Sequence, residues 1–181
     1  MRIVRDKTVG AIIDVQDRLL PHIFEGDRVL QKISTLVQGL ETLGVPLTLT
    51  EQYPKGLGPT DARLMSVFSA PPEPLIKGSF SCCDDAIFER QLHELQRETI
   101  LIAGIETHVC LLQTVIDLIE HEYSPVVVVD ATSSRNPRDA EIALRRMEQA
   151  GAVLTTVESV LLELTRFSGT DEFKAISRLI K

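Results

Sequence analysis

The sequence has no run of basic residues, and its 26 Asp and Glu side chains outnumber its 19 Lys and Arg side chains, which leaves a net charge of −7 over 181 residues. Such a charge opposes binding to nucleic acid and to anionic membranes. No apolar stretch approaches the roughly 18 residues that a membrane-spanning helix needs. Because Arg2, Arg5, Asp6 and Lys7 interrupt the N-terminal segment, we expect no signal peptide there and a cytoplasmic protein.

Cysteine is also scarce. The chain has three cysteines, an odd number, and Cys82 and Cys83 are adjacent, which fits reduced thiols better than a disulfide framework. This adjacent pair also lacks the two-residue spacing of a zinc knuckle. A chain of this length can bury roughly 70% of its unfolded surface, so it needs no disulfide or structural metal to fold. No linker divides it, and we expect residues 1–181 to form one domain.

Short β-branched runs alternate with longer segments of helical period, a pattern typical of βαβ units. We expect strands at 9–13, 47–50, 75–76, 99–103, 126–129 and 153–155. We expect helices at 28–43, 62–67, 84–96, 107–122, 139–150, 159–164 and 171–180. Right-handed crossovers then favour an α/β fold of three layers, α/β/α, with a six-stranded parallel sheet in the order 3-2-1-4-5-6.

Ligands of such sheets bind at the carboxyl ends of the strands, beside the switch point between the first and fourth strands. Asp14 follows the first strand, and Cys110 falls in the first turn of the helix after the fourth. A helix N-terminus favours a thiolate, so we expect Cys110 alone among the cysteines to have a strongly depressed pKa. A buried, inert cysteine is the alternative.

Two charged residues, Asp14 and Lys77, sit at predicted strand ends. Lys77 follows the short third strand, and a solvated surface lysine is the alternative to a functional one. Asp14 could equally be a carboxylate that caps a turn. Position alone therefore makes both residues candidates without assigning a reaction to either.

Three ordered motifs resemble the isochorismatase-like cysteine hydrolase superfamily: residues 11–16 (AIIDVQ), 77–81 (KGSFS) and 104–110 (GIETHVC). Residues 51–58 (EQYPKGLG) resemble the branch of the isochorismatase domain-containing proteins and their bacterial relatives. The similarity continues through residues 130–135 (DATSSR) to the end of the chain. The motifs are specific for the superfamily and much less specific for a substrate.

The resemblance implies a catalytic triad of Asp14, Lys77 and Cys110. Asp14 would take the thiol proton, and Lys77 would favour the thiolate and negative charge that develops nearby. Cys110 would attack a carbonyl, ammonia or an amine would leave, and water would hydrolyse the thioester. The resemblance also implies a cis peptide bond between Ile105 and Glu106, and an oxyanion hole formed by the backbone N–H groups of Glu106 and Cys110.

Metal and nucleotide chemistry lack their sequence signals. The nicotinamidase branch of the superfamily has an Asp-x-His and a further His after the second strand, where this chain has Thr50-Glu51-Gln52. The histidines are His22, His93, His108 and His121. None lies in that region, so we expect no metal and no organic cofactor. His108 and Cys110 are two positions apart on one helix and would not face each other as a dyad. Neither G-x-G-x-x-G nor a phosphate-binding loop is present, which argues against a nucleotide-dependent oxidoreductase.

Specificity is expected from loops over the site. Gln52, Tyr53, Leu57 and Phe80 are the substrate-binding candidates, although each could be ordinary packing. Arg135 follows the fifth strand and could clamp a substrate carboxylate, or form a structural ion pair or remain solvated.

The sequence therefore predicts a metal-independent hydrolase that cleaves a carbon–nitrogen bond of a small amide-like substrate through a thioester. The alternatives are a catalytically dormant member that acts as a scaffold or interaction partner, and a strict isochorismatase that cleaves a vinyl ether without the Cys nucleophile. Tyr53, Leu57, Phe167 and Phe173 lie outside the regular strands, and we expect a neighbouring subunit to cover them in a homo-oligomer.

Overall fold

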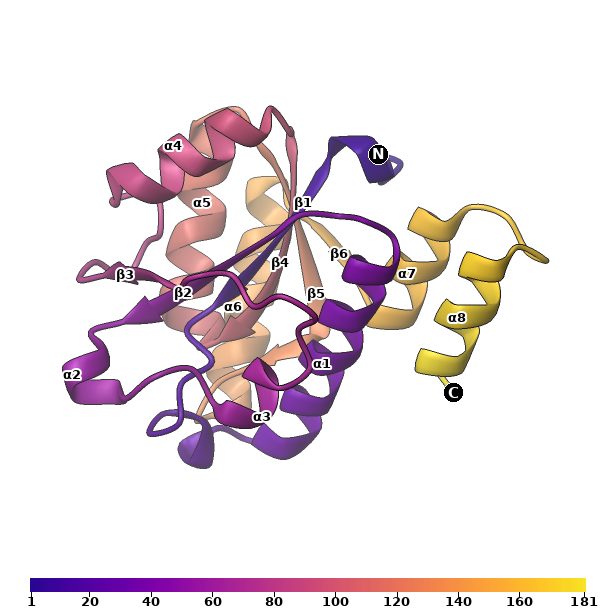
Figure 1. The fold of residues 1–181 in the computed structure, drawn as a ribbon. Coiled ribbons are helices and arrows are strands. Elements are labelled where there is room, and N and C mark those ends of the chain that lie inside the picture. The colour runs from indigo at the N-terminus through magenta and orange to yellow at the C-terminus, as the bar shows by residue number, and fades with distance from the viewer.

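A computed structural model describes all 181 residues, and a six-stranded sheet in the order β3-β2-β1-β4-β5-β6 runs through its centre (Figure 1). Every neighbouring pair of strands is parallel, which confirms the predicted fold class and strand order. The strands are β1 (Thr8–Ile13), β2 (Leu47–Gln52), β3 (Leu75–Lys77), β4 (Thr99–Ile105), β5 (Ser124–Ser133) and β6 (Val153–Thr155).

Helices cover both faces of the sheet. They are α1 (Gly26–Thr42), α2 (Pro54–Leu57), α3 (Ala62–Met65), α4 (Ala86–Leu95), α5 (Leu112–Glu120), α6 (Pro137–Ala150), α7 (Val157–Thr165) and α8 (Asp171–Leu179). Figure 1 shows α1, α7 and α8 on one face and α4, α5 and α6 on the other. None of the helices is long and apolar enough to cross a lipid bilayer.

Local sequence signals set several helix ends. The side chains of Asp85, Asn136 and Thr170 accept hydrogen bonds from the first-turn N–H groups of α4, α6 and α8, which compensates N–H groups that have no partner within the helix. Gly151 ends α6 in the left-handed conformation that glycine favours.

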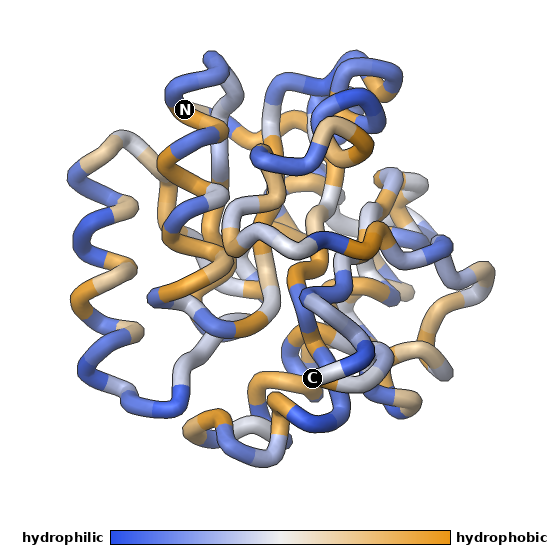
Figure 2. Tube along the Cα trace, turned by 90° about the vertical axis from the view of Figure 1, so that its left-hand side faces the viewer, coloured by the Kyte–Doolittle hydropathy of each residue, from blue (hydrophilic) through white to orange (hydrophobic).

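The central strands are apolar because helices bury both of their faces. Every residue of β1 and of β4 is buried. In Figure 2 the hydrophobic colour concentrates in the interior, while the outer turns of the helices are largely hydrophilic. The two ends of the sheet are therefore the places where polar side chains of the strands can act.

Every strand except β6 extends beyond its predicted limits, and β4, for example, continues to Ile105. β2 continues to Gln52 and β5 continues to Ser133, whereas hydrophobicity alone ended them at residues 50 and 129. Residues 130–133 therefore belong to the strand rather than to the loop after it. The segment after β2, where a loop over the site was expected, contains the short helix α2.

Gly104 brings the carboxyl ends of β1 and β4 unusually close together. Its φ is +131°, and an added Cβ would collide with the backbone carbonyl of Ile13 on the neighbouring strand. Glycine is the residue that allows such an approach. The chain segments that leave these two strands consequently begin side by side at the switch point.

Candidate functional site

Asp14 and Lys77 form a buried ion pair at the carboxyl end of the sheet. Asp14 comes directly after β1, Lys77 is the last residue of β3, and the Lys77 Nζ lies 2.6 Å from Asp14 Oδ2. Their side chains are only 0% and 2% exposed. The Asp14 side chain is therefore paired with a lysine and does not merely cap a turn, and Lys77 is not a solvated surface residue.

Four oxygen atoms surround the Lys77 ammonium group. Besides Asp14 Oδ2, it donates to the side-chain Oε1 of Gln52 at 2.7 Å. The backbone carbonyls of Ser79 and Phe80 lie at 3.2 Å. Burial lowers the pKa of Lys77, but Asp14 and the nearby cysteines outweigh that effect and raise the pKa above its ordinary value. Lys77 is therefore a fixed positive charge beside Asp14.

Cys110 meets this pair from the other side of the switch point. It lies in a π-helical turn, Thr107–Leu111, that leads into α5, and the residue is 6% exposed. Its Sγ lies 4.0 Å from Gln52 Oε1, and the Asp14 carboxylate is near enough to raise the pKa of Cys110. The structure thus brings together the thiol, the carboxylate and the ammonium group that the three sequence motifs contain.

The thiol of Cys110 is not acidic in the resting protein. Burial raises the pKa of Cys110 well above its ordinary value, the Asp14 carboxylate raises it further, and Lys77 acts in the opposite direction. Burial likewise raises the pKa values of Cys82 and Cys83 to about 12. The predicted depressed pKa of Cys110 is therefore wrong, because dehydration and the charge of Asp14 outweigh Lys77 and the helix N-terminus. The resting thiol keeps its proton.

Because Asp14 raises the pKa of Cys110 and Lys77 lowers it, removing each charge should change alkylation in opposite directions. At about pH 8 we expect iodoacetamide to modify Cys110 faster in Asp14→Asn and more slowly in Lys77→Met than in the wild type, since the thiolate is the reactive form. Peptide mass spectrometry after timed reactions measures each cysteine separately. Changes of the same sign in both variants would contradict this electrostatic account.

The predicted oxyanion groups lie where the chain enters the π-helical turn. The peptide bond between Ile105 and Glu106 is cis. The Glu106 N–H donates to no backbone or side-chain acceptor, whereas the Glu106 carboxylate accepts from the backbone N–H of Arg135 at 2.9 Å and from its Nε at 3.1 Å. The guanidinium of Arg135 thus forms an ion pair with Glu106, which was the alternative to a substrate clamp.

The remaining candidates divide into exposed and engaged side chains. Tyr53 and Phe80 are 59% and 54% exposed, and Leu57 is half-buried. Gln52 is buried, and both ends of its side-chain amide contact the protein itself. His108 contacts the hydroxyl of Ser134 through Nδ1 at 2.8 Å, a hydrogen bond with no cysteine involved.

Two residues outside the candidates predicted from the sequence touch the site. Thr50 Oγ1 donates to Asp14 Oδ1 at 2.7 Å, and Gln16 bonds to both backbone groups of Gln52. Strand alternation could have revealed Thr50, because residues 50 and 52 share one face of a strand. Gln16 is the last residue of the motif at residues 11–16, and that motif is the signal that could have revealed it.

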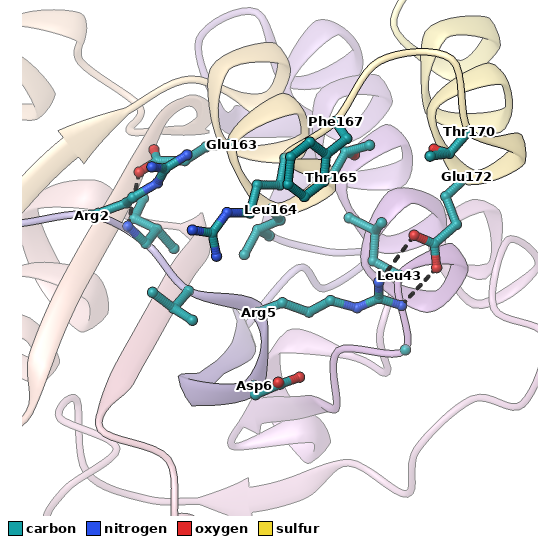
Figure 3. Close-up of a pocket in the computed structure, with 14 residues that line it drawn as sticks. Arg2, Arg5, Asp6, Leu43, Glu163, Leu164, Thr165, Phe167, Thr170 and Glu172 are labelled. Atoms are coloured by element: carbon teal, nitrogen blue, oxygen red, sulfur yellow. Dashed lines mark hydrogen bonds and ion pairs between the residues drawn. The ribbon is translucent and has the colours of Figure 1, made fainter.

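A cavity of about 520 Å³ lies away from these residues, where β1 and β2 begin. Figure 3 shows Arg5 and Glu172 joined across it by two hydrogen bonds. None of Asp14, Lys77 and Cys110 lines this cavity. No group of three or more His, Cys, Asp or Glu side chains is arranged to hold a metal ion. The candidate site is therefore the triad itself.

Known proteins resemble this chain over nearly its whole length. Isochorismatase family protein 1B of Dictyostelium discoideum is 38% identical over 184 aligned residues, which cover 99% of this chain and 89% of that protein. The solved structure of MAR1 ribonuclease from Caenorhabditis elegans is 36% identical with a TM-score of 0.94, and the match covers 99% of this chain and 92% of that one.

Two YcaC structures share the fold at lower identity. The Escherichia coli protein, described as an octameric hydrolase of unknown specificity, is 26% identical with a TM-score of 0.92, over 99% of this chain and 89% of that one. The Pseudomonas aeruginosa protein, solved with covalent acrylamide, is 27% identical with a TM-score of 0.89, and the match covers 97% of this chain and 89% of that one. Because residues 10–159 also match the Isochorismatase domain, this chain belongs to the isochorismatase family and has its hydrolase fold.

Proposed function

We propose that this protein hydrolyses a carbon–nitrogen bond of a small amide-like substrate, with Cys110 as nucleophile and without a metal. The observation that carries the proposal is the buried Asp14–Lys77 ion pair at 2.6 Å beside Cys110, whose Sγ lies 4.0 Å from the same Gln52 oxygen that Lys77 contacts. A protonated thiol needs a nearby base before it can attack, and the Asp14 carboxylate would serve as that base.

The reaction has two halves. Asp14 takes the proton of Cys110 as Sγ attacks the amide carbon, and the same proton then passes to the nitrogen that leaves as ammonia or an amine. Water, deprotonated by Asp14, attacks the resulting thioester, and the acid product departs as Cys110 recovers its proton. In both halves of the reaction, the ammonium of Lys77 stabilises the negative charge that develops on the reacting groups. Its four acceptors hold the ammonium in place.

Backbone donors would bind the oxyanion of each tetrahedral intermediate. The N–H of Glu106 is free of other hydrogen bonds, and Cys110 belongs to the π-helical turn that follows Glu106. Loss of such a donor typically costs roughly a hundredfold or more in rate. Because both groups belong to the backbone, side-chain substitutions would not remove them.

The expected partner is a small molecule rather than RNA, although the similar Caenorhabditis elegans structure is named a ribonuclease. The chain has a net charge of −7, which repels a phosphate backbone. Tyr53 and Phe80, whose backbones contact Lys77 and whose side chains are exposed, and the half-buried Leu57 would offer apolar contacts to a compact substrate. The predicted cytoplasmic location stays a prediction.

A screen of primary amides, carbamoyl compounds and hydroxamates tests the proposal by ammonia or hydroxylamine release. We expect turnover of at least one compound by the wild type and none by Cys110→Ala, with Cys83→Ala as the matched control that retains activity. Acrylamide, found covalently bound in the Pseudomonas aeruginosa relative, should label Cys110 ahead of Cys82 and Cys83. Turnover that survives Cys110→Ala would refute the cysteine mechanism.

The filled triad does not favour the dormant alternative. A scaffold protein has no need for a buried lysine and aspartate beside a cysteine, because each buried charge costs free energy. If neither amides nor acrylamide react, the dormant scaffold becomes the better description.

We also propose a homo-oligomer, because the Escherichia coli relative is octameric and apolar side chains lie exposed here. Of the four residues that a neighbouring subunit is predicted to cover, Tyr53 and Phe167 are 59% and 68% exposed, whereas Leu57 and Phe173 are half-buried. We expect light scattering at micromolar concentration to give an even multiple of the 20.1 kDa chain mass. A mass of one chain would refute it.

A further inference from the structure

Strand β2 lies between the strands that carry the two charged residues of the site. Its neighbours are β1, which ends just before Asp14, and β3, which ends at Lys77. In the register of the sheet, Thr50 is opposite Ile13 and Gln52 is opposite Lys77. Because side chains alternate along a strand, Thr50 and Gln52 project from the same face of β2.

Thr50 contacts the aspartate. Its hydroxyl donates to Asp14 Oδ1 at 2.7 Å, while the ammonium of Lys77 donates to Oδ2. The two carboxylate oxygens therefore have different partners. The Thr50 hydroxyl thus opposes rotation of the carboxylate about its Cβ–Cγ bond.

Gln52 contacts the lysine in an orientation that its other partner fixes. The Nε2 group donates to the carbonyl of Gly78 at 3.0 Å, and Oε1 accepts from the Lys77 Nζ at 2.7 Å. A flipped amide would place an NH₂ group against the ammonium and an oxygen against a carbonyl, and both contacts would be repulsive. The oxygen of Gln52 consequently faces Lys77 and Cys110.

Gln16 holds the backbone from which Gln52 projects. Its Oε1 accepts from the Gln52 N–H at 2.8 Å, and its Nε2 donates to the Gln52 carbonyl at 3.1 Å and to that of Gly58 at 2.6 Å. Gln16 is fully buried. The backbone of Gln52 is thereby anchored independently of any substrate.

We propose that Thr50 and Gln52 are positioning residues: Thr50 acts through Asp14 and Gln52 acts through Lys77. This inference rests on the proposed function, and it gives Gln52 a different role from the substrate contact that its sequence position predicts. A substrate contact needs a free polar atom, and the side-chain amide of Gln52 has protein partners at both ends. One strand therefore aligns the base and the cation of the site.

The ammonium signal of Lys77 in ¹⁵N NMR, assigned by its loss in Lys77→Met, tests the inference without requiring turnover. Exchange of an ammonium proton with water is slow only while its acceptors hold it. We expect Gln52→Met and Thr50→Val to accelerate this exchange about tenfold or more, because Gln52→Met removes one acceptor of the ammonium and Thr50→Val removes the hydrogen bond that fixes another, Asp14. Thr50→Ser retains the hydroxyl that donates to Asp14 and should restore slow exchange.

Thr48→Val is the matched control. Thr48 lies on the same face of β2 and is also buried, but its hydroxyl donates to Gln91 Oε1 at 2.7 Å, away from the triad. The Thr48→Val variant should lose stability to a similar degree as Thr50→Val. It should leave the exchange of the Lys77 ammonium protons unchanged. An unchanged signal in both Thr50→Val and Gln52→Met, or an equal change in Thr48→Val, would overturn the inference.

Kinetics separate this inference from the proposed function. With an amide substrate from the screen, positioning predicts that kcat falls about tenfold in Gln52→Met while KM stays unchanged. A substrate contact instead predicts a raised KM, which would refute the positioning role. If no amide is turned over but the Lys77 signal responds as expected, the proposed function fails and the positioning of the ion pair stands.

Discussion

We expect Asp14→Asn and Lys77→Met each to lower kcat/KM for the amide substrate by roughly 10³-fold or more, and the double variant to be little worse than either single one. The reason is that the two residues form one unit: the 2.6 Å ion pair places the proton acceptor beside Cys110. Once either member is gone, the other no longer occupies its working position. Steady-state kinetics of the three variants measure this effect.

Lys32→Met is the matched control for the kinetic result. Lys32 pairs with Asp130 at 3.3 Å, but both side chains are partly exposed and neither contacts the triad. Its kcat/KM should stay within about twofold of the wild type. Losses that multiply in the Asp14→Asn, Lys77→Met double variant would show that the two residues act at separate steps.

The second large effect concerns stability. Lys77→Met should lower the free energy of unfolding by about 3–5 kcal/mol, because it leaves the buried Asp14 carboxylate without its cation. Adding Asp14→Asn should recover much of that loss, since the double variant contains no unpaired buried charge. Urea unfolding followed by circular dichroism, with the slope of the transition compared between variants, gives the differences.

An exposed pair provides the comparison for stability. Lys7 and Glu98 are 2.7 Å apart with side chains 60% exposed, so Lys7→Met should cost less than about 1 kcal/mol. If the double variant at the site were less stable than Lys77→Met alone, the loss would have to come from packing rather than from the unpaired charge.

The fold could be read from the sequence because burial on both faces makes strands such as β1 and β4 uniformly apolar. The limits of the strands could not be read from the sequence, because hydrophobicity marks only the buried middle of each strand. The end of β2 is polar at Glu51 and Gln52, so the pattern ended that strand early. This error of two residues assigned Gln52 to a loop and thus to substrate contact.

The electrostatics of Cys110 were harder to foresee. A cysteine at the start of a helix is favoured as a thiolate, and the sequence position suggested that state. The pKa of Cys110 depends instead on its burial and on the nearby charge of Asp14. Both arise from strands that lie far apart in the sequence and meet only in the folded protein. The motif therefore predicts which residues meet but not their charge states.

The absence of a side chain at residue 104 also constrains engineering of this protein. The distance between the segments that carry Asp14 and Cys110 is set where β1 and β4 meet, and there any Cβ would strike the carbonyl of Ile13. A library that seeks new substrates should therefore keep Gly104 constant. Tyr53 and Phe80, whose side chains are largely exposed, can be varied without touching the backbone that aligns the reacting groups.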